Sequence, residues 1–121
     1  MKDFNGEING KVKEYNYDGK LKFEGEYLNG KREGKGKEYY SNGNLKIEGE
    51  YLNGKRNGKG KDYYNDGKLL FEGEYLNGIK WNGKGYNING NIEFVIKDGK
   101  ISKNLLFLLE KEYKNFNRNM D

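Results

Sequence analysis

Pairs of glutamates recur along the chain at a spacing that carboxylate chemistry can use. The pairs are Glu24 and Glu26, Glu48 and Glu50, and Glu72 and Glu74. Two residues apart on a strand, such side chains share a face at roughly 7 Å, a separation also found between the acid and the base of inverting glycosidases. Three copies flanked by lysines are instead typical of a solvated charge ladder, because a catalytic pair has no reason to recur.

Nucleotide binding and nucleophilic catalysis have weaker candidates. Residues 78–85 have the spacing of a phosphate-binding loop up to Lys84, but Gly85 stands where a serine or threonine must hold Mg²⁺. The serines of the chain are Ser41 and Ser102, and there is no histidine to activate either. Cysteine is absent as well, so the chain has no thiolate ligand for a metal. We therefore expect no enzymatic activity, no cofactor and no metal.

A set of basic residues also repeats, and it indicates binding. The set, called the basic ladder, comprises Lys31, Arg32, Lys35, Lys55, Arg56, Lys59, Lys80 and Lys84. Stacked repeats would align these side chains in a stripe, where anionic lipid headgroups would contribute on the order of 1 kcal/mol per residue. An acidic groove on a protein would fit equally, whereas the interleaved glutamates oppose nucleic acid. The plain alternative is a charged surface that keeps a sheet soluble.

These side chains belong to an internal repeat of 24 residues. Residues 24–32 return unchanged at 48–56, and two successive whole copies differ at seven of 24 positions. The chain begins partway through a repeat, and the pattern decays toward a degenerate hairpin at the other end. There, residues 78–83 are one longer than residues 54–58, so we expect a one-residue insertion. Atypical end repeats cap the open edges of a solenoid.

Each repeat has the pattern of a β-hairpin. Residues 21–27 alternate apolar and charged side chains, which predicts a strand with one apolar face. A pair of turn residues, Asp-Gly or Asn-Gly, precedes each such strand. Such pairs favour a type I′ turn, because both of its central residues need positive φ. The pairs are Asp18-Gly19, Asn42-Gly43 and Asp66-Gly67. Glycines on the apolar face, at 25, 49 and 73, leave room for an aromatic ring from a neighbouring strand to lie over each.

The composition approaches that of a disordered chain, yet its aromatic residues predict folding. Only 33% of residues are hydrophobic and 35% are charged, with a mean hydropathy of -1.18. Aromatics make up 15% and recur with the repeat, and each buries roughly 150–250 Å². Residues 1–20 contain no apolar run of the signal-peptide type, and no stretch approaches the roughly 20 apolar residues of a membrane span. We therefore expect a cytoplasmic protein.

The predicted fold is mainly β. Residues 1–100 are expected to form a single-layer antiparallel ribbon of stacked β-hairpins, followed by a helical segment over residues 101–121. Residues 101–118 have apolar side chains at helical spacing, with Ser102 as N-cap. The apolar side chains of this tail include Leu105, Leu106, Leu108 and Leu109. The helix would either cap the last hairpins or leave the sheet as a docking or dimerisation element.

The repeat resembles the MORN (membrane occupation and recognition nexus) repeat. That motif reads aromatic–Glu–Gly–x–Trp, then Asn–Gly–Lys, then Gly–x–Gly. This chain has Phe-Glu-Gly-Glu-Tyr at 23–27, Asn-Gly-Lys at 29–31 and Gly-Lys-Gly at 34–36. The resemblance covers roughly residues 5–94, with tyrosine in place of the usual tryptophan and one extra residue per repeat near the hairpin turn. It implies a fold of stacked MORN-type hairpins.

The resemblance also implies a non-enzymatic scaffold for a protein partner, attached to a membrane cortex or to the cytoskeleton. Eukaryotic members are often homodimers, and related bacterial proteins labelled antitoxins imply sequestration of a toxin. We expect the partner on the aromatic side of the sheet, because rigid tyrosines lose little entropy on binding. The residues are Phe23, Tyr27, Ile47, Tyr51, Phe71 and Tyr75. The alternative is attachment to anionic membranes through the basic ladder.

Overall fold

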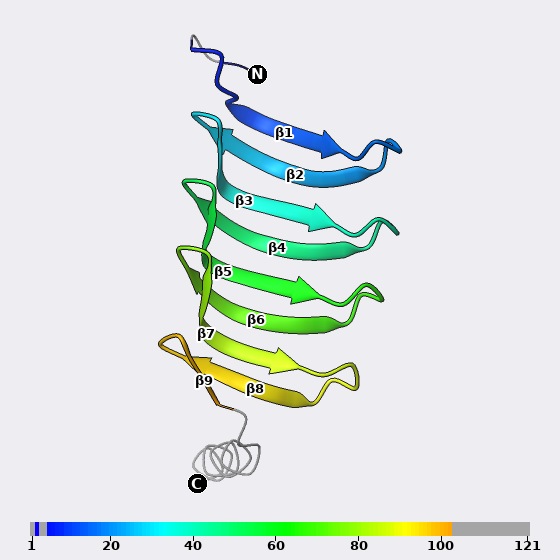
Figure 1. Cartoon of the computed structure of the whole chain (residues 1–121), viewed down its shortest axis with the longest axis vertical. Helices are drawn as coiled ribbons and strands as arrows, with labels where there is room; N and C mark the ends of the chain where they lie inside the picture. Colours follow the sequence, from blue (N-terminus) through cyan, green and yellow to red (C-terminus); the bar gives the residue numbers. More distant parts are fainter. Residues whose placement is uncertain (1, 3–4, 103–121) are drawn as a thin grey trace, which may run out of the picture.

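The computed structural model describes residues 2 and 5–102, which form one open, single-layer sheet (Figure 1). The strands are antiparallel and follow chain order, so each strand pairs with its neighbours in sequence. The strands of the described residues are β1 (Gly10–Tyr15), β2 (Leu21–Leu28), β3 (Lys31–Tyr39), β4 (Leu45–Leu52), β5 (Lys55–Tyr63), β6 (Leu69–Leu76), β7 (Ile79–Tyr86), β8 (Ile92–Lys97) and β9 (Lys100–Ser102). The predicted antiparallel ribbon of hairpins is confirmed.

The sheet extends two residues beyond the predicted boundary at residue 100. Ile101 and Ser102, expected to begin a helix, lie in β9 and pair with β8. The reason is a two-residue turn at Asp98-Gly99, where φ is 51° and 77° and the chain folds back into another hairpin. No helix occurs among the described residues. The predicted helical tail from residue 103 onward, with Leu105, Leu106, Leu108 and Leu109, lies outside them.

Two kinds of turn alternate along the sheet, and the type I′ turns lie at the edge opposite to the predicted one. At Asn29-Gly30 both φ values are positive, 52° and 78°, as type I′ requires. At the other edge, the Gly19 N–H donates to the Asn16 carbonyl and only the glycine has positive φ. That geometry is a three-residue loop. Type I′ turns at Asp18-Gly19, Asn42-Gly43 and Asp66-Gly67 are therefore a wrong prediction.

The two-residue turns bond to the preceding repeat. The Gly54 N–H donates to the Arg32 carbonyl at 2.9 Å, and the Asn53 N–H donates to the Glu33 carboxylate at 3.0 Å. Equivalent bonds recur one repeat earlier and one repeat later. Backbone donors that a tight turn leaves unpaired are thus satisfied by the neighbouring repeat. These bonds tie successive hairpins together along the edge that carries the type I′ turns.

A row of glycines crosses the middle of the sheet from β2 to β7. Its members, each paired with the next, are Gly25, Gly36, Gly49, Gly60, Gly73 and Gly83. A Cβ atom added at Gly49 would lie 2.8 Å from the Lys59 carbonyl oxygen and 2.9 Å from the Gly60 Cα. Neighbouring strands therefore approach more closely along this row than side chains would allow.

Different groups lie over different members of the glycine row. The ring over Gly25 belongs to Phe23 of the same strand, with Cζ 2.8 Å from an added Cβ, and not to a neighbouring strand as predicted. At Gly49 the nearest side-chain atom is Nη2 of Arg56, at 3.4 Å. Ile47 stands in that repeat where phenylalanine stands in its neighbours, so β4 has no phenylalanine ring to cover the glycine.

Strand β7 departs from the other repeats by a deletion, although the sequence predicts an insertion. Gly83 pairs with Gly73 as Gly60 pairs with Gly49. Gly83 follows Gly60 by 23 residues (83 − 60), one fewer than the period of 24. The irregular stretch between the turn and the glycine row is therefore one residue shorter, and Trp81 lies within it.

The core is a thin layer on one face of the sheet. Phe23 and Phe71 are fully buried, and Tyr51 and Tyr75 are almost so. The rings meet edge to face, with centroids 5.9 Å apart for Phe23 and Tyr51 and 5.7 Å apart for Phe71 and Tyr75. Each such pair contributes about 0.5–1.5 kcal/mol beyond the burial of its area. Aromatic contacts within a strand and between successive hairpins thus take the place of a second layer.

Replacing Gly49 with valine is expected to lower the free energy of unfolding by about 1–3 kcal/mol. The new side chain would meet backbone atoms of β5, which cannot move aside as a flexible side chain does. Thermal unfolding measures the effect. Gly19→Asn is the control, because an added Cβ there has no neighbour within 4 Å and asparagine tolerates positive φ. A Gly49→Val protein as stable as its parent would contradict this account of the glycine row.

Candidate functional site

Arginines cover the aromatic rings on one side of the sheet. This side, called the aromatic face, carries Phe23, Tyr51, Phe71 and Tyr75. The guanidinium carbon of Arg32 lies 3.7 Å from the centroid of the Phe23 ring, and that of Arg56 lies 3.8 Å from the centroid of Tyr75. The negative face of a ring attracts the cation, and the arginine stem covers apolar surface. The arginines therefore complete the core.

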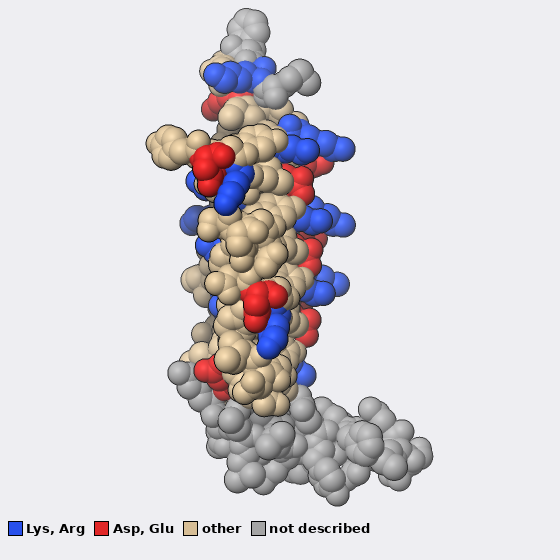
Figure 2. Space-filling view, turned by 90° about the vertical axis from the view of Figure 1, so that its right-hand side faces the viewer, with Lys and Arg blue, Asp and Glu red and all other residues tan. Residues whose placement is uncertain are grey.

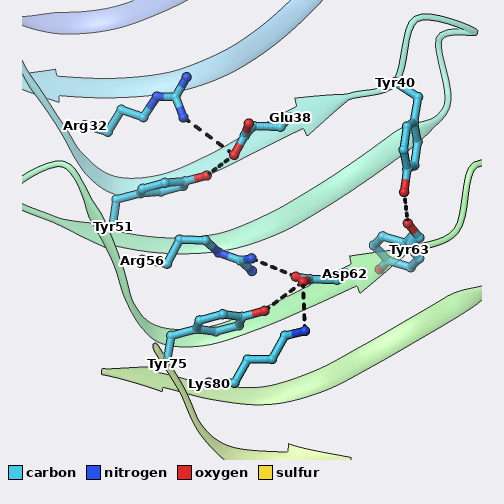
Figure 3. Close-up of polar contacts among 9 residues, drawn as sticks. All are labelled: Arg32, Glu38, Tyr40, Tyr51, Arg56, Asp62, Tyr63, Tyr75 and Lys80. Carbon is cyan, nitrogen blue, oxygen red and sulfur yellow. Dashed lines mark hydrogen bonds and ion pairs between the residues drawn. The ribbon is translucent and has the colours of Figure 1, made fainter. Parts of the chain in front are cut away.

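Carboxylates and tyrosine hydroxyls hold these guanidinium groups in place. Glu38 accepts a hydrogen bond from the Tyr51 hydroxyl at 2.9 Å and lies 3.5 Å from Nη1 of Arg32 (Figure 3). Arg32 also pairs with Glu14 at 3.6 Å, and Glu14 accepts a hydrogen bond from Tyr27. One arginine thus connects carboxylates of two successive repeats across the rings.

Asp62 has three polar partners one repeat further along, two through hydrogen bonds and one through an ion pair. They are Nη1 of Arg56 at 2.7 Å, the Tyr75 hydroxyl at 2.8 Å and Nζ of Lys80 at 3.9 Å (Figure 3). A Cβ added at Gly60 would lie 2.6 Å from Nη2 of Arg56. The Arg56 guanidinium therefore fills the space over Gly60, just as the Phe23 ring fills the space over Gly36 in the preceding repeat.

The structure places the predicted partner-binding residues together on the aromatic face, where most of them form its core. Phe23 and Phe71 have no exposed surface, and Tyr51 and Tyr75 are 5% and 6% exposed. Tyr27 and Ile47 are half-buried. Because ion pairs lie over the rings, a partner would have to displace them before it contacted an aromatic side chain.

The basic ladder is divided between two faces and one edge, because successive residues of a strand point to opposite sides. Arg32, Arg56 and Lys80 lie on the aromatic face, against rings and carboxylates. Lys35 and Lys59 lie on the opposite face, and Lys84 pairs there in register with Glu72. Lys31 and Lys55 begin β3 and β5 beside the two-residue turns. The predicted single stripe is not formed.

The side opposite the aromatic face, called the groove face, carries a long open groove of about 1230 Å³. Its floor consists of Val12 and the glycine row from Gly25 to Gly73, so it lies at the level of the backbone. Lysines and glutamates of β1 to β6 form its walls. They are Lys11, Lys13, Glu24, Glu26, Lys35, Lys37, Glu48, Glu50, Lys59, Lys61, Glu72 and Glu74.

Charge on the groove face changes sign from strand to strand. Strands β1, β3 and β5 each contribute two lysines, and β2, β4 and β6 each contribute two glutamates. Lys37 pairs with Glu24 on one side and Glu48 on the other. Figure 2, a view of the edge with the longer loops, shows basic and acidic side chains alternating down its right-hand side. Such cross-strand pairs each contribute roughly 0.2–1 kcal/mol.

Tyrosines fix one glutamate of each pair. The Tyr39 hydroxyl donates to Glu24 at 2.5 Å and the Tyr63 hydroxyl donates to Glu48 at 2.5 Å, each from the following strand. Tyr86 makes the equivalent bond to Glu72 at 2.9 Å. These bonds are not predicted from the sequence, although the first two tyrosines lie at a constant offset of 15 residues from their glutamates. The second glutamate of each pair lies further from these tyrosines, toward the type I′ turns.

The groove face presents charged side chains to another molecule. Among the described residues, no three acidic side chains gather closely enough to hold a metal ion. The same part of the chain contains no helix long and apolar enough to cross a membrane. What the groove offers another molecule is alternating charge on long side chains above a floor of backbone.

Comparison with protein families matches three stretches of the chain. The model of the MORN repeat matches residues 23–45. The model of the MORN repeat variant matches residues 8–29 and 56–77. Together these stretches lie within β1 to β6 and the turn that follows, which is the part of the sheet that carries the groove. A search of curated proteins gives no match.

Alkaline pH is expected to destabilise the fold. Burial, together with neighbouring glutamates, raises the pKa of Tyr39, Tyr51 and Tyr63 to about 12, from an ordinary value of 10.0. Folded chains therefore keep protons that unfolded chains lose, and the free energy of unfolding should fall as the pH rises from 10 to 12. Circular dichroism and tyrosinate absorbance, followed together, measure this coupling.

Tyr17 provides the control for this prediction because its side chain is fully exposed. Tyr17→Phe should leave the alkaline unfolding transition unchanged, whereas Tyr63→Phe should shift it. Ionisation of every tyrosine near pH 10.0 in a chain that stays folded would contradict the prediction.

Proposed function

Because this chain is a MORN-repeat protein, we propose that it is a non-enzymatic scaffold that binds a protein partner along its groove face. MORN repeats are a repeat type that binds proteins or membranes. The observation that carries the proposal is the groove itself, which runs without interruption across six strands. A site of that length suits an elongated segment of another protein and not a small molecule.

The dimensions of the groove suit such a segment. Strands lie about 4.8 Å apart, so β1 and β6 are separated by roughly 24 Å. That distance corresponds to about 7 residues of extended chain or about 16 residues of helix. A partner segment of this size can contact every strand of the groove at once. The alternating charges then set its register, because like charges brought together are costly.

The sequence predicts that a partner binds the aromatic face. The groove face is the better binding surface. Lys35 and Lys59 are exposed and can move to meet a partner without disturbing the core. On the aromatic face, a partner would have to break the pair between Arg56 and Asp62, which has a distance of 2.7 Å. Separating a largely buried ion pair leaves an uncompensated charge, which is strongly destabilising.

The charge balance of the groove face supports a protein partner over an anionic membrane. Its walls hold six lysines and six glutamates, so attraction and repulsion of lipid headgroups largely cancel. The arginines of the basic ladder are already paired on the aromatic face. We place the protein in the cytoplasm, at a membrane or cytoskeletal structure that its partner supplies. A toxin held by an antitoxin-type scaffold would be one such partner.

Affinity capture from the source cell tests the proposal. The intact chain should retain a stoichiometric protein, and the variant Lys35→Glu/Lys59→Glu should retain it at least about tenfold less well, because one lysine on each of two groove strands becomes acidic. The variant Lys20→Glu/Lys68→Glu is the matched control, since it makes the same change of net charge in the exposed loops. It should retain the partner as the parent does.

Two outcomes would contradict the proposal. Equal retention by the groove variant and its control would mean that the partner binds elsewhere. Recovery of anionic lipid alone, released by salt, would mean that the protein attaches to membranes, because screening weakens exposed charge interactions. Vesicles of anionic and of neutral lipid, sedimented with the purified chain, separate lipid binding from protein binding.

A further inference from the structure

The charges of the groove face follow a rule that no single partner segment requires. Among the residues that line the groove, strands that contribute lysines alternate with strands that contribute glutamates from β1 to β6. The twelve wall residues sum to zero, although the whole chain carries a net charge of +4. A face with this alternation is complementary to itself when it is displaced by one strand.

We propose that the groove face binds the groove face of a second copy of this chain. The two copies are related by a two-fold axis that runs parallel to the strands and passes between β3 and β4. β3 of each copy then faces β4 of the other, β2 faces β5, and β1 faces β6. This inference rests on the proposed function, because it assigns a partner to the same groove.

Charge decides the position of the axis. With the axis between β3 and β4, Lys35 faces the partner's Glu50 and Lys37 faces the partner's Glu48. The two-fold repeats both contacts, and every other strand of the groove also meets a strand of opposite charge. An axis passing through a strand would place lysine strands opposite lysine strands. Two-fold dimers are the commonest symmetric assembly, and their interfaces are self-complementary in this sense.

Only backbone lies between the two rows of charge on the groove face, because the positions of the glycine row are directed toward the aromatic face. Along Gly36 and Gly49 no side chain rises between the two rows of charge. Long lysine and glutamate side chains of one copy can therefore lie over the glycine floor of the other. Their methylene stems then pack on backbone while their charged ends pair. The walls of the groove carry no net charge, which limits the repulsion that a chain of charge +4 would otherwise bring to its own copy.

The test uses two charge-reversed variants, each checked for folding by circular dichroism and each measured by analytical ultracentrifugation. The parent chain should dimerise, and its dissociation constant should rise at least about tenfold in high salt. Lys35→Glu/Lys37→Glu alone should be monomeric, because β3 and β4 would then both be acidic. Glu48→Lys/Glu50→Lys alone should be monomeric, because both would be basic. An equimolar mixture of the two should form a heterodimer.

Two further chains keep the proposal falsifiable if either variant folds poorly. The chain with all four substitutions exchanges the charges of β3 and β4, so it should dimerise alone. Lys20→Glu/Lys68→Glu has the same net charge as the first variant and should dimerise as the parent does. A monomeric parent, or a mixture that stays monomeric while both variants are folded, would overturn the dimer. The scaffold proposal would then stand or fall separately, on the capture experiment.

Discussion

The close approach of strands along the glycine row is the constraint on which the structure depends. A single-layer sheet has no second layer to bury its apolar face, so its core must lie flat against the backbone. An added Cβ at Gly36 would lie 2.9 Å from the Phe23 ring and 3.1 Å from the Tyr51 ring. Any larger residue would lift these rings into solvent. The six paired glycines are therefore a condition of the core, at the cost of strand propensity.

Ion pairs on the aromatic face follow from the same constraint. A ring that lies flat on a sheet has its outer side open to water, and here Arg32 covers it at 3.7 Å. The guanidinium must in turn be neutralised, which Glu38 of the same strand β3 and Glu14 of β1 accomplish. Where Ile47 replaces phenylalanine, Arg56 moves into the vacant space and pairs more closely, with Asp62 at 2.7 Å. Cation and ring thus substitute for one another between repeats.

The period and the alternation of the sequence are local signals, and they predict the strands, their order and the antiparallel ribbon. These local signals do not predict features that depend on contacts between strands. Asn29 has a positive φ and Asp18 does not, although Asn29-Gly30 and Asp18-Gly19 are both favourable turn pairs by composition. The basic ladder is continuous only in the linear sequence, because strand alternation places Arg32 on the aromatic face and Lys35 on the groove face. No residue pattern in the sequence indicates the groove, because its floor consists of backbone.

One row of glycines therefore serves both sides of the sheet. On the aromatic face it admits rings and guanidinium groups, and on the groove face its backbone forms the floor between two rows of charge. Stability and binding are coupled through the same residues, since a Cβ at Gly49 would press on β5 from the core side and also distort the groove floor. Wall residues such as Lys35 are free of this coupling, because their side chains meet neither the rings nor the glycines of the core. Partner choice can thus change through the charged walls while the glycine row preserves the fold.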